Sequence, residues 1–275
     1  MTITRPEILM ETTVNVSPLR ISKYTVFLKS IFHNSLFTDT YLSWLYGQSP
    51  YGPAVCFNAY ADGKLVGHLA ALPRAYDVNK REIPGLLIVN TAVDETFVRH
   101  GIFAKLITCL KDYAETQNVD FILGIPNRNA LNGWVRRGKA HHLGCLDLYV
   151  RPFMAPKPTR PILTFTKNDE MLAWLSHDPA HQRKITQGGL HAKYNGISYA
   201  LFSIFSNDAV SNIRTRFGPS LLNGYIGKGP VSGGSIKLPQ ALKPSPLHVI
   251  LITDKDDVLE IFRTHDIQGK DFDAT

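Results

Sequence analysis

A strand–helix–strand unit between residues 86 and 125 constrains the fold of this chain more than any other feature. The run LLIVNTAV, residues 86–93, is almost entirely apolar and has the length of a strand, which predicts a central strand buried on both faces. An amphipathic helix follows Gly101, and DFILGI, residues 120–125, reads as a second buried strand. Two such strands joined through one helix are expected to be parallel, with a right-handed crossover. The sequence therefore predicts an α/β fold built around this βαβ unit.

Further strands and helices are expected on both sides of this unit. Asp62-Gly63 separates two runs of strand-forming residues and is a hairpin signal. Before the unit, the patterns predict helices at 22–34 and 37–47 and strands at 54–60 and 64–72. After it, they predict a helix that ends at Gly138, strands at 145–150, 199–205, 221–227 and 247–253, and a last helix at 254–266.

A proline-rich stretch divides the chain. Residues 151–161 hold four prolines, a composition typical of a linker. We therefore expect two domains, at 1–152 and 153–275. Matching residues recur in the same order in both halves, which favours a second domain that is a smaller, diverged copy of the first, with coincidence as the alternative. The pairs are Leu42 and Leu172, Trp44 and Trp174, Leu45 and Leu175, and Gly63 and Gly196.

Composition and charge exclude several classes of protein. Hydrophobic residues make up 44% of the 275 residues and charged residues 19%, which is ordinary for a globular protein and argues against a disordered one. The three cysteines have no metal-binding spacing such as C-x-x-C, so we expect a reducing, cytoplasmic location and no metal. Because no long apolar run is present, neither a signal peptide nor a membrane anchor is expected. A net charge of +7 without basic blocks favours an anionic small molecule over nucleic acid.

The segment Arg99-His100-Gly101 stands where the central helix begins. Glycine is a poor helix former, so its presence there needs a reason. It could simply close a turn, with the basic residues facing water. It could also let an anion approach the backbone, because a helix N-terminus has free N–H groups and the positive end of the helix dipole.

Two motifs in the first half resemble the GCN5-related N-acetyltransferase (GNAT) superfamily, over roughly residues 40 to 150. VDETFVRHGIF, residues 93–103, is similar to the family pattern V-x-P-x-x-(Q/R)-x-x-G-x-(G/A) at a central strand that leads into a helix. Asn127, Ala130, Trp134 and Gly138 fall at the spacings of a second pattern, N-x-x-A-x-x-x-Y-x-x-x-G. GIFAKL and GIPNRNA resemble members in which two acetyltransferase-like halves are fused. The resemblance implies a GNAT-like mixed central sheet flanked by helices, followed by a second, smaller and diverged GNAT-like lobe.

The resemblance implies a site for acetyl-CoA or another acyl-CoA. In the family, the glycine loop and the helix start cradle the pyrophosphate, and the strand before them binds the pantetheine arm and polarises the thioester carbonyl. Asn127 would contact cofactor or substrate, or would only cap a helix. The other binding residues that the resemblance implies are Ala92, Val93, Arg99, His100, Gly101, Ile102, Phe103 and Ala104.

The sequence departs from the family pattern at several positions. Val98 replaces the usual Arg or Gln, Glu95 replaces proline, and Phe103 replaces a small residue. These changes put affinity for the cofactor in doubt more than the fold. Trp134 stands where family members have a tyrosine that protonates the departing thiolate, and an indole cannot do so.

No residue is marked clearly as the general base. The central strand holds neither a carboxylate nor a histidine. Asp94 and Glu95 lie just past its end and His68 lies on a neighbouring strand. Each has a plainer reading: solvated surface for the two acids, and a hydrogen-bonded core imidazole for His68.

The resemblance implies an N-acetyltransferase acting on a primary amine. An amino sugar or a nucleotide-linked amino sugar is slightly favoured, because aromatic residues near the first strand can stack on sugar rings, although at helical spacing they are more often core. These residues are Tyr41, Trp44, Tyr46 and Tyr51. Two alternatives stay open: a non-catalytic protein that kept the fold, and a peptidyl transferase that uses aminoacyl-tRNA.

Overall fold

The computed structural model describes residues 6–153, 157–186, 189–193, 202–205, 222–231, 233–239 and 246–269. Two compact units emerge. Unit 1 comprises Met1–Arg74 and Gly85–Ile122, and unit 2 comprises Ala75–Pro84 and Leu123–Thr275. The domain boundary expected at residues 152 and 153 falls inside unit 2.

The strands of unit 1 follow one another in sequence order. They are β1 (Ile8–Val14), β2 (Val55–Ala61), β3 (Lys64–Val78) and β4 (Arg81–Val93), with β5 (Phe121–Gly124) beside β4. β2 pairs antiparallel with both β1 and β3. The hairpin predicted between β2 and β3 is confirmed, because Asp62 and Gly63 both adopt positive φ angles, of 48° and 76°. The last residues of β3 and the first residues of β4 lie within Ala75–Pro84 and so belong to unit 2.

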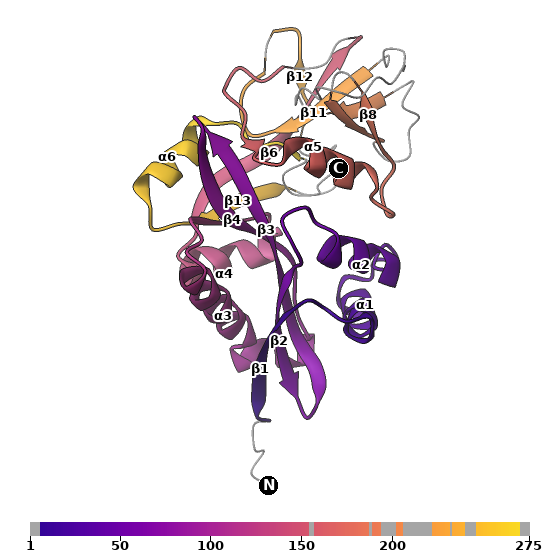
Figure 1. Cartoon of the computed structure of the whole chain (residues 1–275), viewed down its shortest axis with the longest axis vertical. Coiled ribbons are helices and arrows are strands. Elements are labelled where there is room, and N and C mark those ends of the chain that lie inside the picture. Colours follow the sequence, from indigo (N-terminus) through magenta and orange to yellow (C-terminus); the bar gives the residue numbers. More distant parts are fainter. Residues whose placement is uncertain are drawn as a thin grey trace. The chain divides into compact units, whose positions relative to one another are not determined.

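Helices cover both faces of the unit 1 strands (Figure 1). α1 (Pro18–Phe32) and α2 (Asp39–Gly47) lie on one face, and α3 (Ile102–Thr116) lies on the other. Successive residues of a strand point to opposite faces. Accordingly, Phe57 of β2 packs edge-on against Tyr113 of α3, while the next residue, Asn58, bonds to Tyr24 of α1.

The amphipathic helix predicted after Gly101 is confirmed as α3. Its buried residues recur at helical spacing: Ile102, Leu106, Ile107, Leu110 and Ala114. Phe103 and Tyr113, which the pattern also assigned to this face, are only half-buried. Next to α3 in sequence, β5 packs closely on β4. A side chain at Gly85 would overlap the ring of Phe121, with a Cβ only 2.1 Å from the ring.

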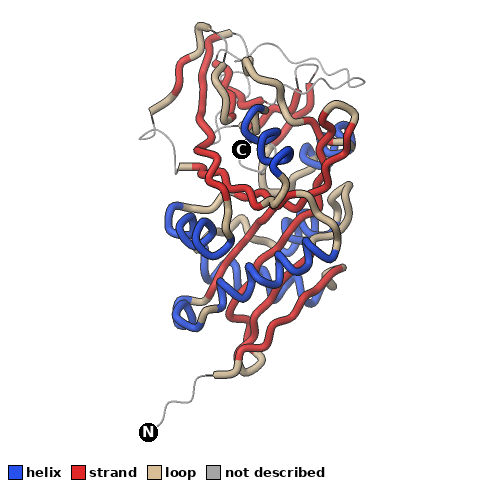
Figure 2. The backbone as a smooth tube through the Cα atoms, turned by 90° about the vertical axis from the view of Figure 1, so that its left-hand side faces the viewer, coloured by secondary structure: helices blue, strands red, loops and turns tan. Residues whose placement is uncertain are grey.

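Both units combine helices with strands (Figure 2). The strands of unit 2 run in the order β5, β13, β6, β11, β10, β9 and β8, with β12 on β6 and β7 on the end of β3. Its elements in chain order are α4 (Arg128–Gly138), β6 (His141–Pro152), β7 (Thr164–Phe165), α5 (Asn168–Ser176), β8 (Arg183–Thr186), β9 (Gly189–Ala192), β10 (Phe202–Phe205), β11 (Leu222–Gly227), β12 (Ile236–Lys237), β13 (Leu247–Ile252) and α6 (Asp256–Thr264).

Aromatic rings join distant segments within unit 2. Tyr76, at the end of β3, stacks on Phe165 of β7 with the ring centroids 5.1 Å apart. Phe262 of α6 meets the same tyrosine edge-on. Both phenylalanines and Tyr76 are fully buried, so these contacts form part of the core of unit 2. Among the helices described, none is long and apolar enough to cross a bilayer.

The recurring residues of the two halves lie in similar helices. Leu42, Trp44 and Leu45 are buried in α2, and Leu172, Trp174 and Leu175 are buried in α5. Both helices have nine residues. The pair Gly63 and Gly196 cannot be compared, because Gly196 lies outside the described residues. Duplication of the two halves therefore stays a prediction.

Candidate active site

The loop from β4 to α3 has the local structure that an anion site requires. A short 3₁₀ turn, η1 (Glu95–His100), follows β4, and Gly101 connects it to α3. Gly101 has φ 73° and ψ 11°, in the left-handed region that other residues rarely adopt. Among the described residues, no atom lies within 4 Å of the position that a Cβ would occupy there, so the backbone of Gly101 faces open space.

The first turn of α3 supplies the backbone donors of this loop. The first N–H groups of an α-helix have no acceptor within the helix and carry the positive end of its dipole. Gly101 is the N-cap, and its carbonyl accepts the first helical hydrogen bond, from the N–H of Lys105. The helix start is held rigidly, because the side chain of Ile102 is buried against Gly67 of β3. Ile102 could therefore serve a ligand only through its backbone.

Two basic residues precede the glycine. Arg99 is exposed at the end of η1, where its charge is available to an anion in solution. His100 is half-buried beside Phe97, with ring centroids 5.2 Å apart. Its Nδ1 atom is buried and has no hydrogen-bond partner among the described residues.

β4 is kinked just before the predicted binding residues Ala92 and Val93. Asn90 has φ 51°, a left-handed conformation inside an otherwise extended strand. Such a residue interrupts the ladder of backbone hydrogen bonds and redirects the residues that follow. The amide of Asn90 donates to the hydroxyl of Tyr46, at 2.9 Å, which fixes the kink to α2. Asn90 was not predicted from the sequence, although an asparagine within an apolar strand was a possible signal.

His68 lies in the core and not in a solvent-facing site. It is fully buried, with Nε2 3.0 Å from the hydroxyl of Tyr46 and Nδ1 2.8 Å from Oδ1 of Asn58. Burial lowers the pKa of His68 to about 3, so the ring is neutral near pH 7. The structure thus supports the plainer reading of His68, a hydrogen-bonded core imidazole.

The two acids after β4 also have local surroundings that argue against a general base. Asp94 accepts hydrogen bonds from the N–H and hydroxyl of Thr96, at 3.0 and 2.6 Å, and pairs with Lys64 at 3.2 Å. The bonds from Thr96 and the nearby Lys64 lower the pKa of Asp94. Glu95 is exposed on η1. Asp94 therefore caps the turn that leads to Gly101.

Solved structures of other proteins have a similar fold. No family model matches the chain, and no curated protein matches it. Among solved structures, a GCN5-related N-acetyltransferase from Anabaena variabilis superposes with a TM-score of 0.58 at 12% identity, over 88% of this chain and 72% of that one. A putative acetyltransferase from Pyrococcus horikoshii gives 0.54 at 10% identity, over 90% of both chains.

A third structure has the same arrangement. It is a conserved Enterococcus faecalis protein described as a probable N-acyltransferase, with a TM-score of 0.52 at 9% identity, over 89% of this chain and 73% of that one. The chain has the GNAT fold. Identities this low establish the fold alone. The predicted fold class, a mixed α/β sheet of GNAT type flanked by helices, is confirmed.

The GNAT motif residues of unit 2 have structural roles of their own. Asn127 caps α4, because its Oδ1 accepts a 2.8 Å hydrogen bond from the N–H of Ala130. Trp134 is on the same helix and only 2% exposed. The helix-cap alternative for Asn127 is therefore realised, and contact with a cofactor stays a prediction.

The aromatic residues that suggested sugar stacking are mostly in the core. Tyr41, Trp44 and Tyr46 of α2 are all buried, with Trp44 3% and Tyr46 1% exposed. Only Tyr51 is partly accessible. Helical spacing placed these side chains against the sheet, so three of the four cannot stack on a sugar.

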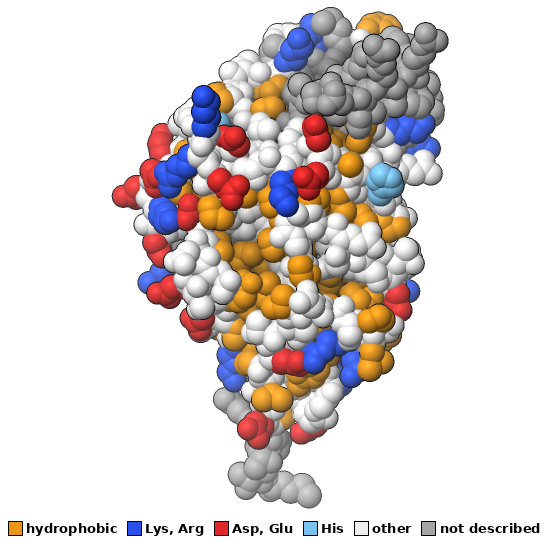
Figure 3. Space-filling model, in the orientation of Figure 1, with side chains coloured by type: hydrophobic (Ala, Val, Ile, Leu, Met, Phe, Trp, Pro, Cys, Tyr) orange, Lys and Arg blue, Asp and Glu red, His pale blue; other side chains and the backbone are white. Residues whose placement is uncertain are grey.

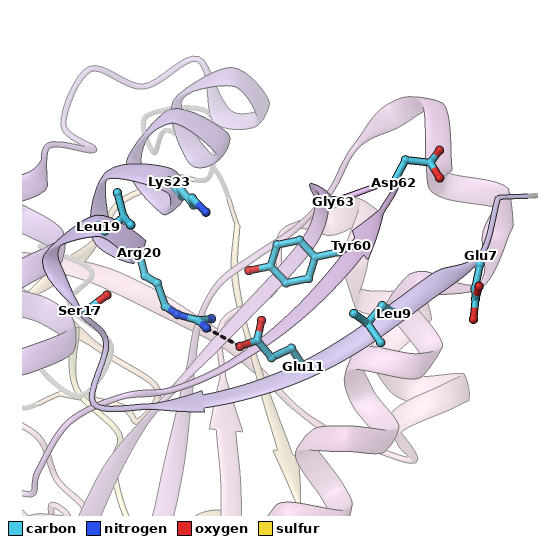
Figure 4. Close-up of a pocket in the computed structure, with 10 residues that line it drawn as sticks. All are labelled: Glu7, Leu9, Glu11, Ser17, Leu19, Arg20, Lys23, Tyr60, Asp62 and Gly63. Atoms are coloured by element: carbon cyan, nitrogen blue, oxygen red, sulfur yellow. Dashed lines mark ion pairs between the residues drawn. The ribbon is translucent and has the colours of Figure 1, made fainter.

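One hollow of unit 1 lies apart from the predicted residues. It has a volume of about 680 Å³ and is lined by Glu7, Leu9, Glu11, Ser17, Leu19, Arg20, Lys23, Tyr60, Asp62 and Gly63 (Figure 4). Arg20 pairs with Glu11 at 2.6 Å, and the bond from Arg20 lowers the pKa of this carboxyl. The hollow contains none of the residues of the β4–α3 loop.

Proposed function

We propose that this protein is an acyl-CoA-dependent N-acyltransferase that transfers an acetyl or other acyl group to a primary amine. One observation carries the proposal. In a GNAT fold, the loop after β4 places a left-handed glycine, Gly101, in open space at the start of α3. A glycine in that conformation lets a phosphate reach the backbone N–H groups of a helix N-terminus.

The chain's own residues would hold the donor at two places. The N–H groups around Gly101 and the first turn of α3 bind the diphosphate, and the exposed Arg99 adds positive charge. The backbone of Ala92 and Val93 bonds to the pantetheine arm, where one N–H polarises the thioester carbonyl. The left-handed conformation of Asn90 supports this role, because such a residue within a strand locally disturbs regular pairing.

The amine would attack the thioester without a protein base. Acyl-CoA supplies a thioester whose leaving thiol has an ordinary pKa near 8.5. His68 is buried and neutral, and Asp94 is engaged by Thr96 and Lys64. The neutral fraction of the amine is then the nucleophile, and water takes the proton that it loses.

The acceptor is proposed as a primary amine, with an amino sugar or a nucleotide-linked amino sugar as the finer proposal. Burial of Tyr41, Trp44 and Tyr46 removes the stacking argument for a sugar. The net charge of +7 still favours an anionic ligand such as CoA or a nucleotide. On the face drawn in Figure 3, basic and acidic side chains are interspersed, which suits a small ligand better than a nucleic acid.

Calorimetry with CoA tests the proposal. Gly101→Asp places a carboxylate among the N–H groups, and we expect it to weaken CoA binding by on the order of a few kcal/mol. Gly63→Asp is the matched control, because Gly63 has a similar φ of 76° and equally open space, but lies in the β2–β3 hairpin. Equal CoA affinity of both variants and the wild type would contradict this site.

A second measurement separates binding from catalysis. Release of free thiol from acetyl-CoA is followed with a panel of amines that includes amino sugars, nucleotide-linked amino sugars and peptides. Activity with any amine supports the transferase, and the preferred amine identifies the acceptor class. Binding of CoA without turnover would favour a non-catalytic protein. Binding of tRNA in place of CoA, with steep salt dependence, would favour a peptidyl transferase.

A further inference from the structure

Two imidazole groups and one thiol, all of which can ligate a metal ion, lie close together on two neighbouring strands of unit 2. His142 and Cys145 lie on β6, and His248 lies on β13. The Sγ atom of Cys145 is 3.2 Å from Nδ1 of His248, which in turn is 3.2 Å from Nε2 of His142. One ligand atom from each residue lies within 4.8 Å of the other two.

A β-bulge brings the two β6 residues to the same face. Residues three apart in a regular strand point to opposite faces. Here Cys145 pairs with His248 and Gly144 with Val249, but His142 pairs with Ile250, so one extra residue is inserted in β6. Gly144 adopts φ 103° at this point. His142 and Cys145 therefore both lie on the face of His248.

The Nδ1 atom of His248 has two close polar neighbours. Nδ1 of His248 is approached at 3.2 Å by both the thiol and the other imidazole. A ring nitrogen carries one hydrogen or one lone pair, so it serves one of these neighbours well and not both. A cation between the three atoms would use all three lone pairs at once.

The spacing of the three ligand atoms is near that around a tetrahedral zinc ion. Zn–N distances of about 2.0–2.1 Å and a Zn–S distance of about 2.3 Å place the ligand atoms about 3.3 Å (N to N) and about 3.6 Å (N to S) apart. The N-to-N distance of 3.2 Å between His248 and His142 is close to the first value. The S-to-N distance of 3.2 Å between Cys145 and His248 is shorter than the second, and the third pair of ligand atoms lies within 4.8 Å, so small side-chain shifts would complete the zinc geometry. Two imidazoles and a thiolate suit zinc, whereas magnesium and calcium prefer oxygen ligands.

We propose that His142, Cys145 and His248 form a zinc-binding site, with water or a small ligand in the fourth position. Three protein ligands leave one position open in a four-coordinate ion. His142 is exposed and the other two are half-buried, so the ion reaches the site from solvent. This site is independent of acyl-CoA binding and stands whether or not the proposed transferase activity is found.

Zinc binding to the full-length, untagged protein tests the site, because a polyhistidine tag would bind the same ion. Competition with a chromogenic chelator should show one zinc ion per chain. Cys145→Ser, His142→Ala and His248→Ala should each weaken binding by more than about 100-fold, since even second-shell changes cost 10–100-fold. His141→Ala is the matched control, because it precedes His142 and points to the other face of β6.

Cobalt provides a readout specific for the thiolate. With Co²⁺ in place of zinc, the wild type should show a sulfur-to-cobalt charge-transfer band in the near ultraviolet, and Cys145→Ser should lack it. Circular dichroism checks that each variant is folded, and exposed His142 provides a variant with little risk to folding. No stoichiometric zinc in the wild type, unchanged affinity in His142→Ala, or an unchanged band in Cys145→Ser would each overturn the proposal.

Discussion

The hydroxyl of Tyr46 lies 3.0 Å from Nε2 of His68, where both side chains are shielded from solvent. On the other side of the ring, Nδ1 faces Oδ1 of Asn58, which can only accept. Nδ1 therefore carries the hydrogen, and Nε2 accepts from Tyr46. Further hydrogen bonds continue on both sides of the imidazole, since Asn90 donates to Tyr46 and Asn58 donates to Tyr24. The hydrogen bonds form one directional chain that links the kink in β4 to α1.

His68 should make the protein less stable in mild acid. Its pKa is about 3 in the folded protein and near 6.5 when the chain is unfolded. Between these values the unfolded state binds a proton that the folded state does not. The free energy of unfolding should therefore fall by about 1.4 kcal/mol for each unit that the pH drops between about 6.5 and about 3. Urea titrations at several pH values measure this slope.

The variant His68→Gln isolates the contribution of the imidazole. Glutamine is polar but does not titrate, so the slope assigned to His68 should disappear, although overall stability falls. Other groups contribute equally to both proteins and cancel in the difference. A difference in unfolding free energy that stays constant from pH 7 to pH 4 would contradict the buried, neutral state of His68.

Tyr46→Phe should cost more than the loss of an exposed hydroxyl. It removes the donor to His68 and the acceptor of Asn90, and it leaves a buried ring nitrogen unpaired, so we expect a loss of roughly 1–3 kcal/mol. Tyr113→Phe is the control, because Tyr113 is half-buried and makes ring contact with Phe57. That variant should change stability by less than about 0.5 kcal/mol. Equal effects in chemical denaturation would argue against a stabilising chain.

The parts of the fold that depend on local chemistry were predictable. Asp62-Gly63 specified a hairpin, and the spacing of apolar residues specified α3. Asn90 stands out as a polar residue within residues 86–93, but its left-handed conformation was not predictable, because its partner, Tyr46, comes from a distant helix. The pairing of β7 with the end of β3 likewise depends on a contact between Tyr76 and Phe165 that no local pattern contains.

The same distinction applies to the site. A left-handed turn at Gly101 could be expected from the sequence, since glycine readily adopts that conformation, whereas binding of a cofactor there stays a prediction. The two readings of His68 could not be separated without its neighbours Tyr46 and Asn58. A search for C-x-x-C spacing could not find the cluster of His142, Cys145 and His248, because strand pairing and a bulge bring these residues together.

The rate of transfer should follow the ionisation of the amine. Neither His68, with a pKa of about 3, nor Asp94, whose pKa is lowered, changes protonation between about pH 6 and pH 9. The value of kcat/KM should therefore rise tenfold for each pH unit until the pKa of the amine is reached. Two active amines with different pKa values should give profiles displaced by that difference. If kcat/KM instead levels off at the same pH for both amines, the controlling ionisation belongs to a general base in the protein.

Trp134 should matter through its size and not through proton transfer. Its side chain is only 2% exposed on α4, so Trp134→Ala should lower the free energy of unfolding by about 3–5 kcal/mol. Trp134→Tyr should lose less, because tyrosine is nearly as large, and it restores a hydroxyl at the position where the family pattern has one. Transfer by this variant should equal or slightly exceed that of the wild type, as measured by thiol release. Trp134→Phe keeps an aromatic ring but has no N–H. If it folds and binds CoA normally yet loses the chemical step by orders of magnitude, the indole N–H contacts a reacting group and a role in packing alone is wrong.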